Sequence, residues 1–163
     1  MKIMKNQKMH YSSATLALLL GLTLNCFSCL TAQADGGGGG TEGSPIVGLW
    51  NVHYFQGTTQ LFQTYDQWHS DGLEFEVNSI APGAICQGTW KKIGYDSVKL
   101  FHVIWTFDAS GVVNGHIEET QINTVSRDRN TYEGTFDQKF YDLSGNLIGE
   151  ATGTLNATRL SVQ

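Results

Sequence analysis

Residues 97–125 have the sequence SVKLFHVIWTFDASGVVNGHIEETQINTV. Apolar and polar side chains alternate with a period of two on both sides of the segment 108–111, which is the pattern of two strands joined by a turn. The glycine of this turn permits a positive φ, and its aspartate can bond to the turn backbone. Residues 131–162 repeat the arrangement around 142–145. The two segments therefore predict two antiparallel hairpins.

The period of two extends outward from these hairpins to residue 46, and no segment from residue 46 onward has helical periodicity. Short turns separate the predicted strands, and every connection is too short for a parallel crossover. An up-and-down barrel pairs all the strands and leaves no free edge. The sequence therefore predicts an all-β fold, an eight-stranded antiparallel up-and-down barrel, with a flattened sandwich as the alternative. The predicted strands are 46–55, 59–69, 73–79, 85–91, 97–107, 112–125, 131–141 and 147–162.

The N-terminal segment has the features of an export signal. Three lysines within the first eight residues precede an apolar run, 14–24, and then the small-x-small triplet 32–34. We expect residues 1–34 to be a signal peptide cleaved after Ala34, and the protein to be secreted or periplasmic. A retained membrane anchor and a lipoprotein attached through Cys26 or Cys29 are the alternatives.

Cleavage would leave an acidic protein with 7 basic and 15 acidic residues. Such a surface repels nucleic acids and anionic membranes, so we expect no nucleic-acid partner and no membrane insertion after signal removal. Residues 35–44, DGGGGGTEGS, predict a flexible linker before a barrel domain at 45–163. Cys86 would be the single cysteine of this protein, which excludes an internal disulfide and predicts a small buried side chain.

A glycine and a tryptophan on the first predicted strand carry a family resemblance. Gly48-Leu49-Trp50 resembles the Gly-x-Trp signature of the lipocalin and avidin-like barrels, the calycins. In those families the tryptophan closes the barrel floor, and an arginine from the last strand packs across it. The resemblance implies a lipocalin-like barrel with these roles for Trp50 and Arg159. In outline the chain also resembles the small barrels of the allene oxide cyclase type. A likeness of fold does not by itself transfer a function.

Strand alternation predicts which side chains face the lumen. If Trp50 points inward, Tyr54 does so as well. On the last strand the small and apolar file 151–159 is predicted to be internal. A four-residue loop at 142–145 would place Phe136 opposite Ala151 and Tyr132 opposite Leu155, so that Tyr132, Phe136 and Gln138 also face the lumen. A three-residue bulged loop would instead bury unpaired charges.

An equivalent loop at 108–111 would place Val103 opposite His116 and Phe101 opposite Glu118. The file of Phe101, Val103, Trp105 and Phe107 is the more apolar face of its strand and is predicted to be internal. This brings His116 and Glu118 into the lumen, whereas His102 falls on the outer face.

A histidine and a glutamate on one strand face can form an acid–base pair or supply two metal ligands. The alternatives for His116 and Glu118 are a hydrogen-bonded pair without a catalytic role, or an outward ion pair if the register shifts by one. No third ligand stands at metal-ligand spacing in the sequence, so no metal site is predicted. No dinucleotide fingerprint is present, and no cofactor is predicted.

We expect the lumen to bind a small, mostly apolar molecule. The predicted ligand-binding residues are Tyr54, Phe101, Trp105, Tyr132, Phe136 and Gln138. One alternative is a cofactor-free isomerase, cyclase or hydrolase in which His116 and Glu118 are catalytic. A second alternative is a protein-interaction module that acts through its rim loops. The sequence leaves open whether the protein is an enzyme.

Overall fold

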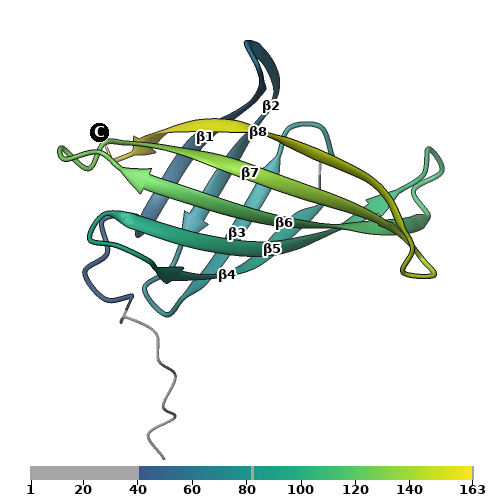
Figure 1. The fold of residues 1–163 in the computed structure, drawn as a ribbon, viewed down its shortest axis with the longest axis horizontal. Coiled ribbons are helices and arrows are strands. Elements are labelled where there is room, and N and C mark those ends of the chain that lie inside the picture. The colour runs from purple at the N-terminus through teal and green to yellow at the C-terminus, as the bar shows by residue number, and fades with distance from the viewer. Residues whose placement is uncertain (1–40, 82, 163) are drawn as a thin grey trace, which may run out of the picture. The chain divides into compact units, whose positions relative to one another are not determined.

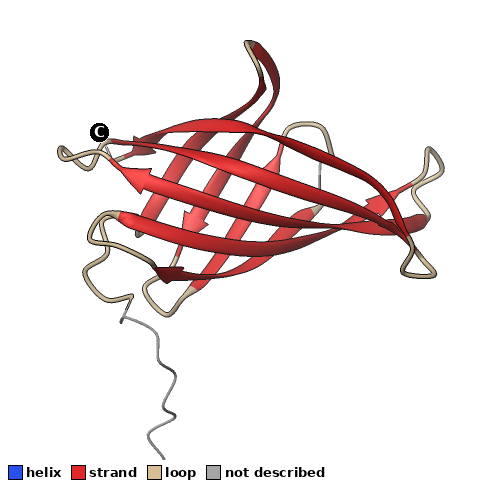
Figure 2. Ribbon diagram, viewed as in Figure 1, coloured by secondary structure: helices blue, strands red, loops and turns tan. Residues whose placement is uncertain are grey.

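A computed structural model describes residues 41–81 and 83–162. The predicted signal peptide, 1–34, and most of the predicted linker lie outside these ranges. The described residues form strands and loops (Figure 2). Within them, no helix is long and apolar enough to cross a membrane.

Eight antiparallel strands close into a barrel (Figure 1). Each strand pairs with the next in the sequence, and the last pairs with the first. This confirms the predicted all-β, up-and-down barrel, with strand ends that differ from the predicted ones by at most two residues. The strands are β1 (Gly48–Gln56), β2 (Thr59–Trp68), β3 (Leu73–Asn78), β4 (Ile85–Lys92), β5 (Ser97–Phe107), β6 (Val113–Val125), β7 (Thr131–Asp142) and β8 (Leu147–Leu160).

The up-and-down order gives the barrel two different ends. The turns 57–58, 108–112 and 143–146, together with residues 79–81 and 83–84, lie at one end, which we call the open end. The loops 69–72, 93–96 and 126–130 lie at the other, the closed end, together with the segment that precedes β1.

Large aromatic side chains fill the barrel near its closed end. The Trp50 and Tyr132 rings meet edge to face with centroids 4.8 Å apart, and those of Trp68 and Trp90 are 5.7 Å apart. The Trp50 indole nitrogen donates a hydrogen bond of 2.7 Å to the carbonyl of Ile46. All of these side chains are buried. Because each buries a large apolar surface, we expect this layer to supply much of the stability of the fold.

Arg159 and Gly48 explain the Gly-x-Trp pattern in physical terms. Arg159 is the β8 partner of Trp50, and its guanidinium carbon lies 4.0 Å from the centroid of the Trp50 ring. The same guanidinium donates hydrogen bonds to the carbonyls of Val47 (2.9 Å) and Arg129 (2.6 Å). Gly48 has a φ of 138°, and a Cβ on this residue would overlap the Arg159 guanidinium. Glycine is therefore required beside the arginine.

The β7–β8 register differs from the predicted one by two residues. Tyr141 pairs with Leu147, one residue later than predicted, and a bulge between Phe140 and Tyr141 adds a second residue, so that Phe136 pairs with Gly153 and Tyr132 with Ala157. A shift of two leaves every side chain on its original face of the sheet. Tyr132 and Phe136 are therefore buried in the barrel, on the side that was predicted.

The β5–β6 hairpin also contains a bulge, between Thr106 and Phe107, and Val103 pairs with Glu118 instead of His116. The prediction that Val103, His116 and Glu118 share one face of the hairpin is right, but the prediction that this face is the inner one is wrong. Phe101 is 43% exposed and Trp105 is 60% exposed, whereas His102 is 2% exposed. Phe101, Val103 and Trp105 lie on the outside of the barrel, together with His116 and Glu118. Phe107, which follows the bulge, lines the cavity described below.

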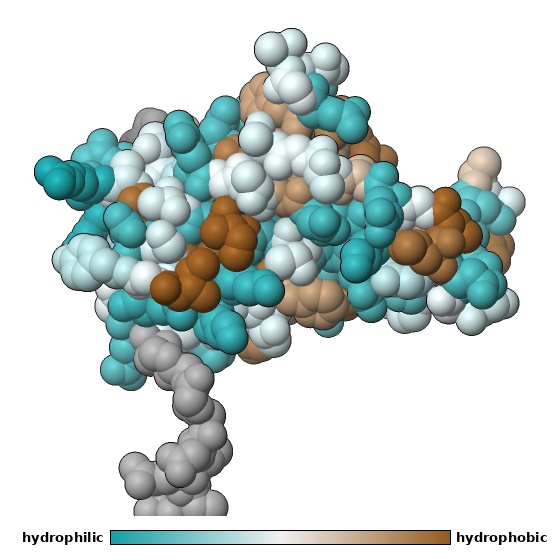
Figure 3. Space-filling model, in the orientation of Figure 1, coloured by the Kyte–Doolittle hydropathy of each residue, from teal (hydrophilic) through white to brown (hydrophobic). Residues whose placement is uncertain are grey.

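The physical reason is that polar side chains form part of the lining of this lumen. The inner file of β5 and β6 includes His102, Glu119 and Gln121, which hydrogen-bond to one another or to facing strands. Buried polar groups with partners are tolerated, so apolarity does not identify the inner face here. Hydrophobic patches are correspondingly visible among hydrophilic side chains on the outer surface in Figure 3.

Candidate functional site

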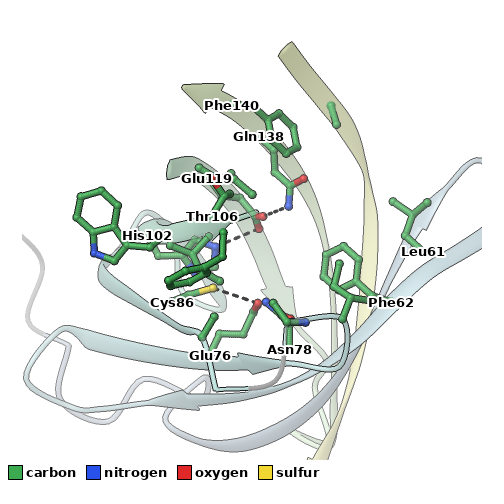
Figure 4. A pocket seen from close by; sticks show the side chains of 18 of the residues that line it. Leu61, Phe62, Glu76, Asn78, Cys86, His102, Thr106, Glu119, Gln138 and Phe140 are labelled. Carbon is green, nitrogen blue, oxygen red and sulfur yellow. Dashed lines mark hydrogen bonds and ion pairs between the residues drawn. The ribbon is translucent and has the colours of Figure 1, made fainter. Parts of the chain in front are cut away.

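A cavity of about 960 Å³ occupies the open half of the barrel (Figure 4). Its walls are largely apolar, and its polar lining includes one residue from each of five adjacent strands. The apolar lining includes Leu61, Phe62, Ile80, Ile104, Phe107, Ile117 and Phe140. The polar lining includes Glu76, Cys86, His102, Glu119 and Gln138. We call this second group the cavity floor.

The strand registers bring the floor residues together. Glu76 on β3 is the partner of Cys86 on β4. Glu119 on β6 is the partner of both His102 on β5 and Gln138 on β7. Partners in a sheet share a face, so these side chains point into the lumen as one band.

His102 lies between two carboxyl groups. Its Nδ1 is 3.2 Å from Oε2 of Glu74, and its Nε2 is 3.5 Å from Oε1 of Glu119. Gly88 on β4 is the partner of both Glu74 and His102. A Cβ at Gly88 would lie 2.6 Å from Oε2 of Glu74 and 2.7 Å from Cβ of His102. The glycine therefore leaves the space that this pair needs.

Glu119 is the most extensively hydrogen-bonded carboxylate of the lumen. The amides of Gln121 and Gln138 both donate to it, from β6 and β7. The Tyr54 hydroxyl lies 3.3 Å from Oε1 of Glu119. The same hydroxyl donates a 2.6 Å hydrogen bond to Oε2 of Glu76, which links the two glutamates across the lumen.

His102 and Glu119 hold each other in their charged forms. Burial alone lowers the pKa of His102, but Glu119, with Glu74 and Glu76, raises that pKa well above its ordinary value. Burial alone raises the pKa of Glu119, but His102 and the hydrogen bonds from Gln138 and Gln121 bring it below its ordinary value. The two side chains therefore form a buried ion pair beside the cavity.

The remaining acids of the lumen have raised pKa values. Burial raises the pKa of Asp66 well above its ordinary value, and Glu76 and Glu74 add to the effect. Burial also raises the pKa of Glu74, against the opposing effect of His102. Burial raises the pKa of Glu76 to about 7. One imidazolium cannot offset four carboxylates, so the extra acids are shifted toward their neutral forms.

His116 and Glu118 lie on the outer face of β6, and neither lines the cavity. His116 Nε2 is 3.9 Å from Oε1 of Glu118, and both side chains are partly exposed. The pair faces outward, as one of the alternatives expected, but the register is shifted by two residues and not by one. The expectation that they enter the lumen is wrong, because the β5 face was chosen by its apolarity.

The predicted ligand-binding residues divide into three groups. Gln138 lines the cavity, and Trp105 lines its mouth from the outer side of β5. Tyr54, Tyr132 and Phe136 are buried in the lumen but are not among the residues that line the cavity. Phe101 is on the outer surface, so its predicted position in the lumen is wrong.

Sequence reasoning missed Glu74, Glu76, His102 and Glu119 as lumen residues. They could have been found by starting from the inward-facing Trp50 and following its pairing partners from one strand to the next, because paired residues share a face. Trp50 pairs with Asp66, Asp66 with Glu76, and Glu76 with Cys86. Cys86 itself was predicted to be buried, and it is.

Comparison of the chain with models of known protein families, with curated proteins and with solved structures finds no match. Function is therefore argued from the cavity. Its floor offers carboxyl, imidazole, thiol and amide groups, which can hydrogen-bond a ligand, transfer a proton or coordinate a metal ion.

Proposed function

We propose that this protein binds a small, mostly apolar molecule in the lumen of its barrel. The observation that carries the proposal is the cavity of about 960 Å³ with apolar walls above a polar floor. Cavities of this size, mostly apolar with a few placed polar groups, are typical of small-molecule sites. A cavity at one end of an eight-stranded barrel is also a common position for a ligand.

The arrangement of the lining favours a mostly apolar ligand with one polar end. Phe62, Ile104 and Phe140 offer apolar contacts in the walls, and Gln138 and Glu76 offer hydrogen bonds at the floor. A polar group on the ligand would hydrogen-bond to these floor residues. A purely apolar ligand would leave the remaining hydrogen-bonding positions of these side chains unused, which costs free energy.

We further propose that the barrel is calycin-like. The proposal is supported by the packing of Arg159 across Trp50 and by the contact that makes glycine necessary at Gly48. These are the positions to which the Gly-x-Trp resemblance assigns the closure of the barrel floor.

A pair of neighbouring substitutions tests the binding proposal. Ile104 lines the cavity, whereas Val103 is on the outer face of the same strand. Ile104→Trp should fill part of the cavity and weaken the binding of apolar fluorescent probes at least tenfold, which is about 1.4 kcal/mol. Val103→Trp should leave probe affinity within about twofold of the original. The measurement is a fluorescence titration with a panel of lipophilic probes that differ in their polar end group.

Saturable binding that Ile104→Trp does not weaken would place the probe outside the lumen and contradict the proposal. Absence of saturable binding by the whole panel would contradict it as well. Circular dichroism and thermal melting of both variants should match the parent protein, so that lost binding is not lost folding.

We also propose that the protein is exported and cleaved after Ala34. The support is the basic start, the apolar run 14–24 and the triplet 32–34. Expression in a host with a general export pathway should yield a processed protein that begins at Asp35. The intact mass of the exported protein decides the matter. A mass that retains residues 1–34, or a lipid on Cys26 or Cys29, would contradict it.

A further inference from the structure

We propose that Glu76, Cys86 and His102 form a binding site for a divalent transition-metal ion, with zinc as the best match. The three side chains are buried, and one potential ligand atom from each lies within 4.8 Å of the other two. They come from β3, β4 and β5, which are adjacent strands. Each of these strands contributes one of the three ligands, so the group forms only when the strands pair and cannot be recognised from the sequence of a single strand. The proposal is independent of whether the cavity binds an apolar molecule.

The separations are close to those that a tetrahedral site needs. Zinc binds sulfur at about 2.3 Å and nitrogen or oxygen at about 2.0–2.2 Å, so its ligand atoms lie roughly 3.3–3.8 Å apart. Sγ of Cys86 is already 3.4 Å from Oε1 of Glu76. The widest separation in the group would have to shrink by about 1 Å, which small rotations of the side chains can supply.

Glu74 holds the imidazole in the orientation that a metal ligand requires. Its Oε2 lies 3.2 Å from Nδ1 of His102, so an ion would bind Nε2 and replace the contact that Nε2 makes with Oε1 of Glu119 at 3.5 Å. A carboxylate on the far nitrogen of a ligating histidine is the usual support in metal sites, where it fixes the ring and raises its basicity. Glu74 is thus a positioning residue in this proposal.

The charge of the lumen also favours a cation. The buried ionisable side chains of the described strands include four carboxyl groups and His102, but no lysine or arginine. Oε1 of Glu74 is buried without a hydrogen-bond partner in this part of the chain. A divalent ion among these groups would offset the excess of acids, which are costly to bury without a counter-charge.

The donor set determines which ions fit. A thiolate with an imidazole selects zinc or another late first-row metal over magnesium and calcium, which prefer oxygen ligands alone. On binding, bonds to the metal replace the S–H bond of Cys86 and the Nε2–H bond of His102, and both protons pass to solvent. All three residues line the cavity, so a fourth position would face it. Three protein ligands and an open position are typical of catalytic zinc sites.

The test is a titration of the chelator-treated protein with cobalt(II), followed by competition with zinc(II). We expect one equivalent of cobalt to bind, with tetrahedral d–d bands in the visible and a thiolate-to-cobalt charge-transfer band in the near ultraviolet. Zinc should displace it. Cys86→Ser should abolish the charge-transfer band. Glu74→Gln should retain the band and weaken cobalt binding by about 10–100-fold, as is usual for the support of a ligating histidine.

The exposed pair on the outer face supplies the matched control. His116→Asn, which removes a histidine that also lies near a glutamate, should leave the cobalt spectrum and stoichiometry unchanged. Binding without a charge-transfer band, binding that Cys86→Ser leaves intact, or binding lost in His116→Asn would overturn the proposal. So would the absence of stoichiometric binding. If Cys86→Ser does not fold, the charge-transfer band of the parent protein and the metal dependence of its melting temperature still decide the question. Probe binding by the metal-free protein tests the apolar-ligand proposal separately.

Discussion

Replacing Trp50 with alanine is expected to lower the free energy of unfolding by about 3–5 kcal/mol, the usual cost of truncating a buried tryptophan. The indole is fully buried, packs against Tyr132, lies beneath the Arg159 guanidinium and donates a hydrogen bond to Ile46. The substitution removes all of these contacts and leaves a cavity at the closed end. Urea denaturation followed by circular dichroism measures the loss.

Trp105→Ala is the matched control, because Trp105 is 60% exposed. This variant should lose less than about 1 kcal/mol, since substitutions of exposed residues have small effects. Similar losses for the two tryptophans would contradict the assignment of Trp50 to the core and Trp105 to the outer surface.

Replacing Glu119 with leucine is expected to destabilise the protein by about 3–5 kcal/mol, the range for a buried ion pair that loses one partner. His102 would lose its counter-charge, and the amides of Gln121 and Gln138 would lose an acceptor. Leucine has a similar volume, so the loss would come from unsatisfied polar groups and not from an empty space. The measurement is urea denaturation with a chelator present, which separates this effect from metal binding.

Glu118→Leu changes the neighbouring glutamate, whose side chain is on the outer face. Its expected effect on the free energy of unfolding is below about 1 kcal/mol. Glu119→Gln keeps an oxygen acceptor and should lose less than Glu119→Leu. A Glu118→Leu variant less stable than Glu119→Leu would show that the faces of β6 are assigned the wrong way round.

Local patterns were sufficient to predict the architecture. Eight segments with alternating polarity are separated by glycine, aspartate and asparagine, which favour turns for known physical reasons. The connections are short, so neighbouring strands had to be antiparallel. The registers of the two hairpins were harder to predict from the sequence. The bulges at Tyr141 and Phe107 depend on the twist of the sheet and the closure of the barrel and not on local composition. In each hairpin a turn one residue longer than predicted and a one-residue bulge together shifted the pairing by two, so the same residues still share a face.

The site was harder to predict than the fold, because its chemistry exists only across strands. Glu74 and Glu76 alternate with Leu73 and Phe75, which is also the pattern of an outward polar face. Their inward position depends on His102, which is remote in sequence and supplies the counter-charge. The rule that apolar residues face inward predicted Phe101 and Trp105 inside the barrel. They lie outside, because the opposite face of β5 carries His102, which belongs to the buried polar network.

The seam between β1 and β8 sets the order in which this domain can fold. Leu49 pairs with Leu160 and Trp50 with Arg159, so the two ends of the domain hold the wall together. These contacts are the most distant in sequence, and their loop-closure entropy must be overcome late. Until β8 arrives, β1 and β7 both present unpaired edges that could join a second chain. A chain interrupted before Arg159 would therefore be prone to aggregate, and its Trp50 ring would lack the guanidinium that covers it.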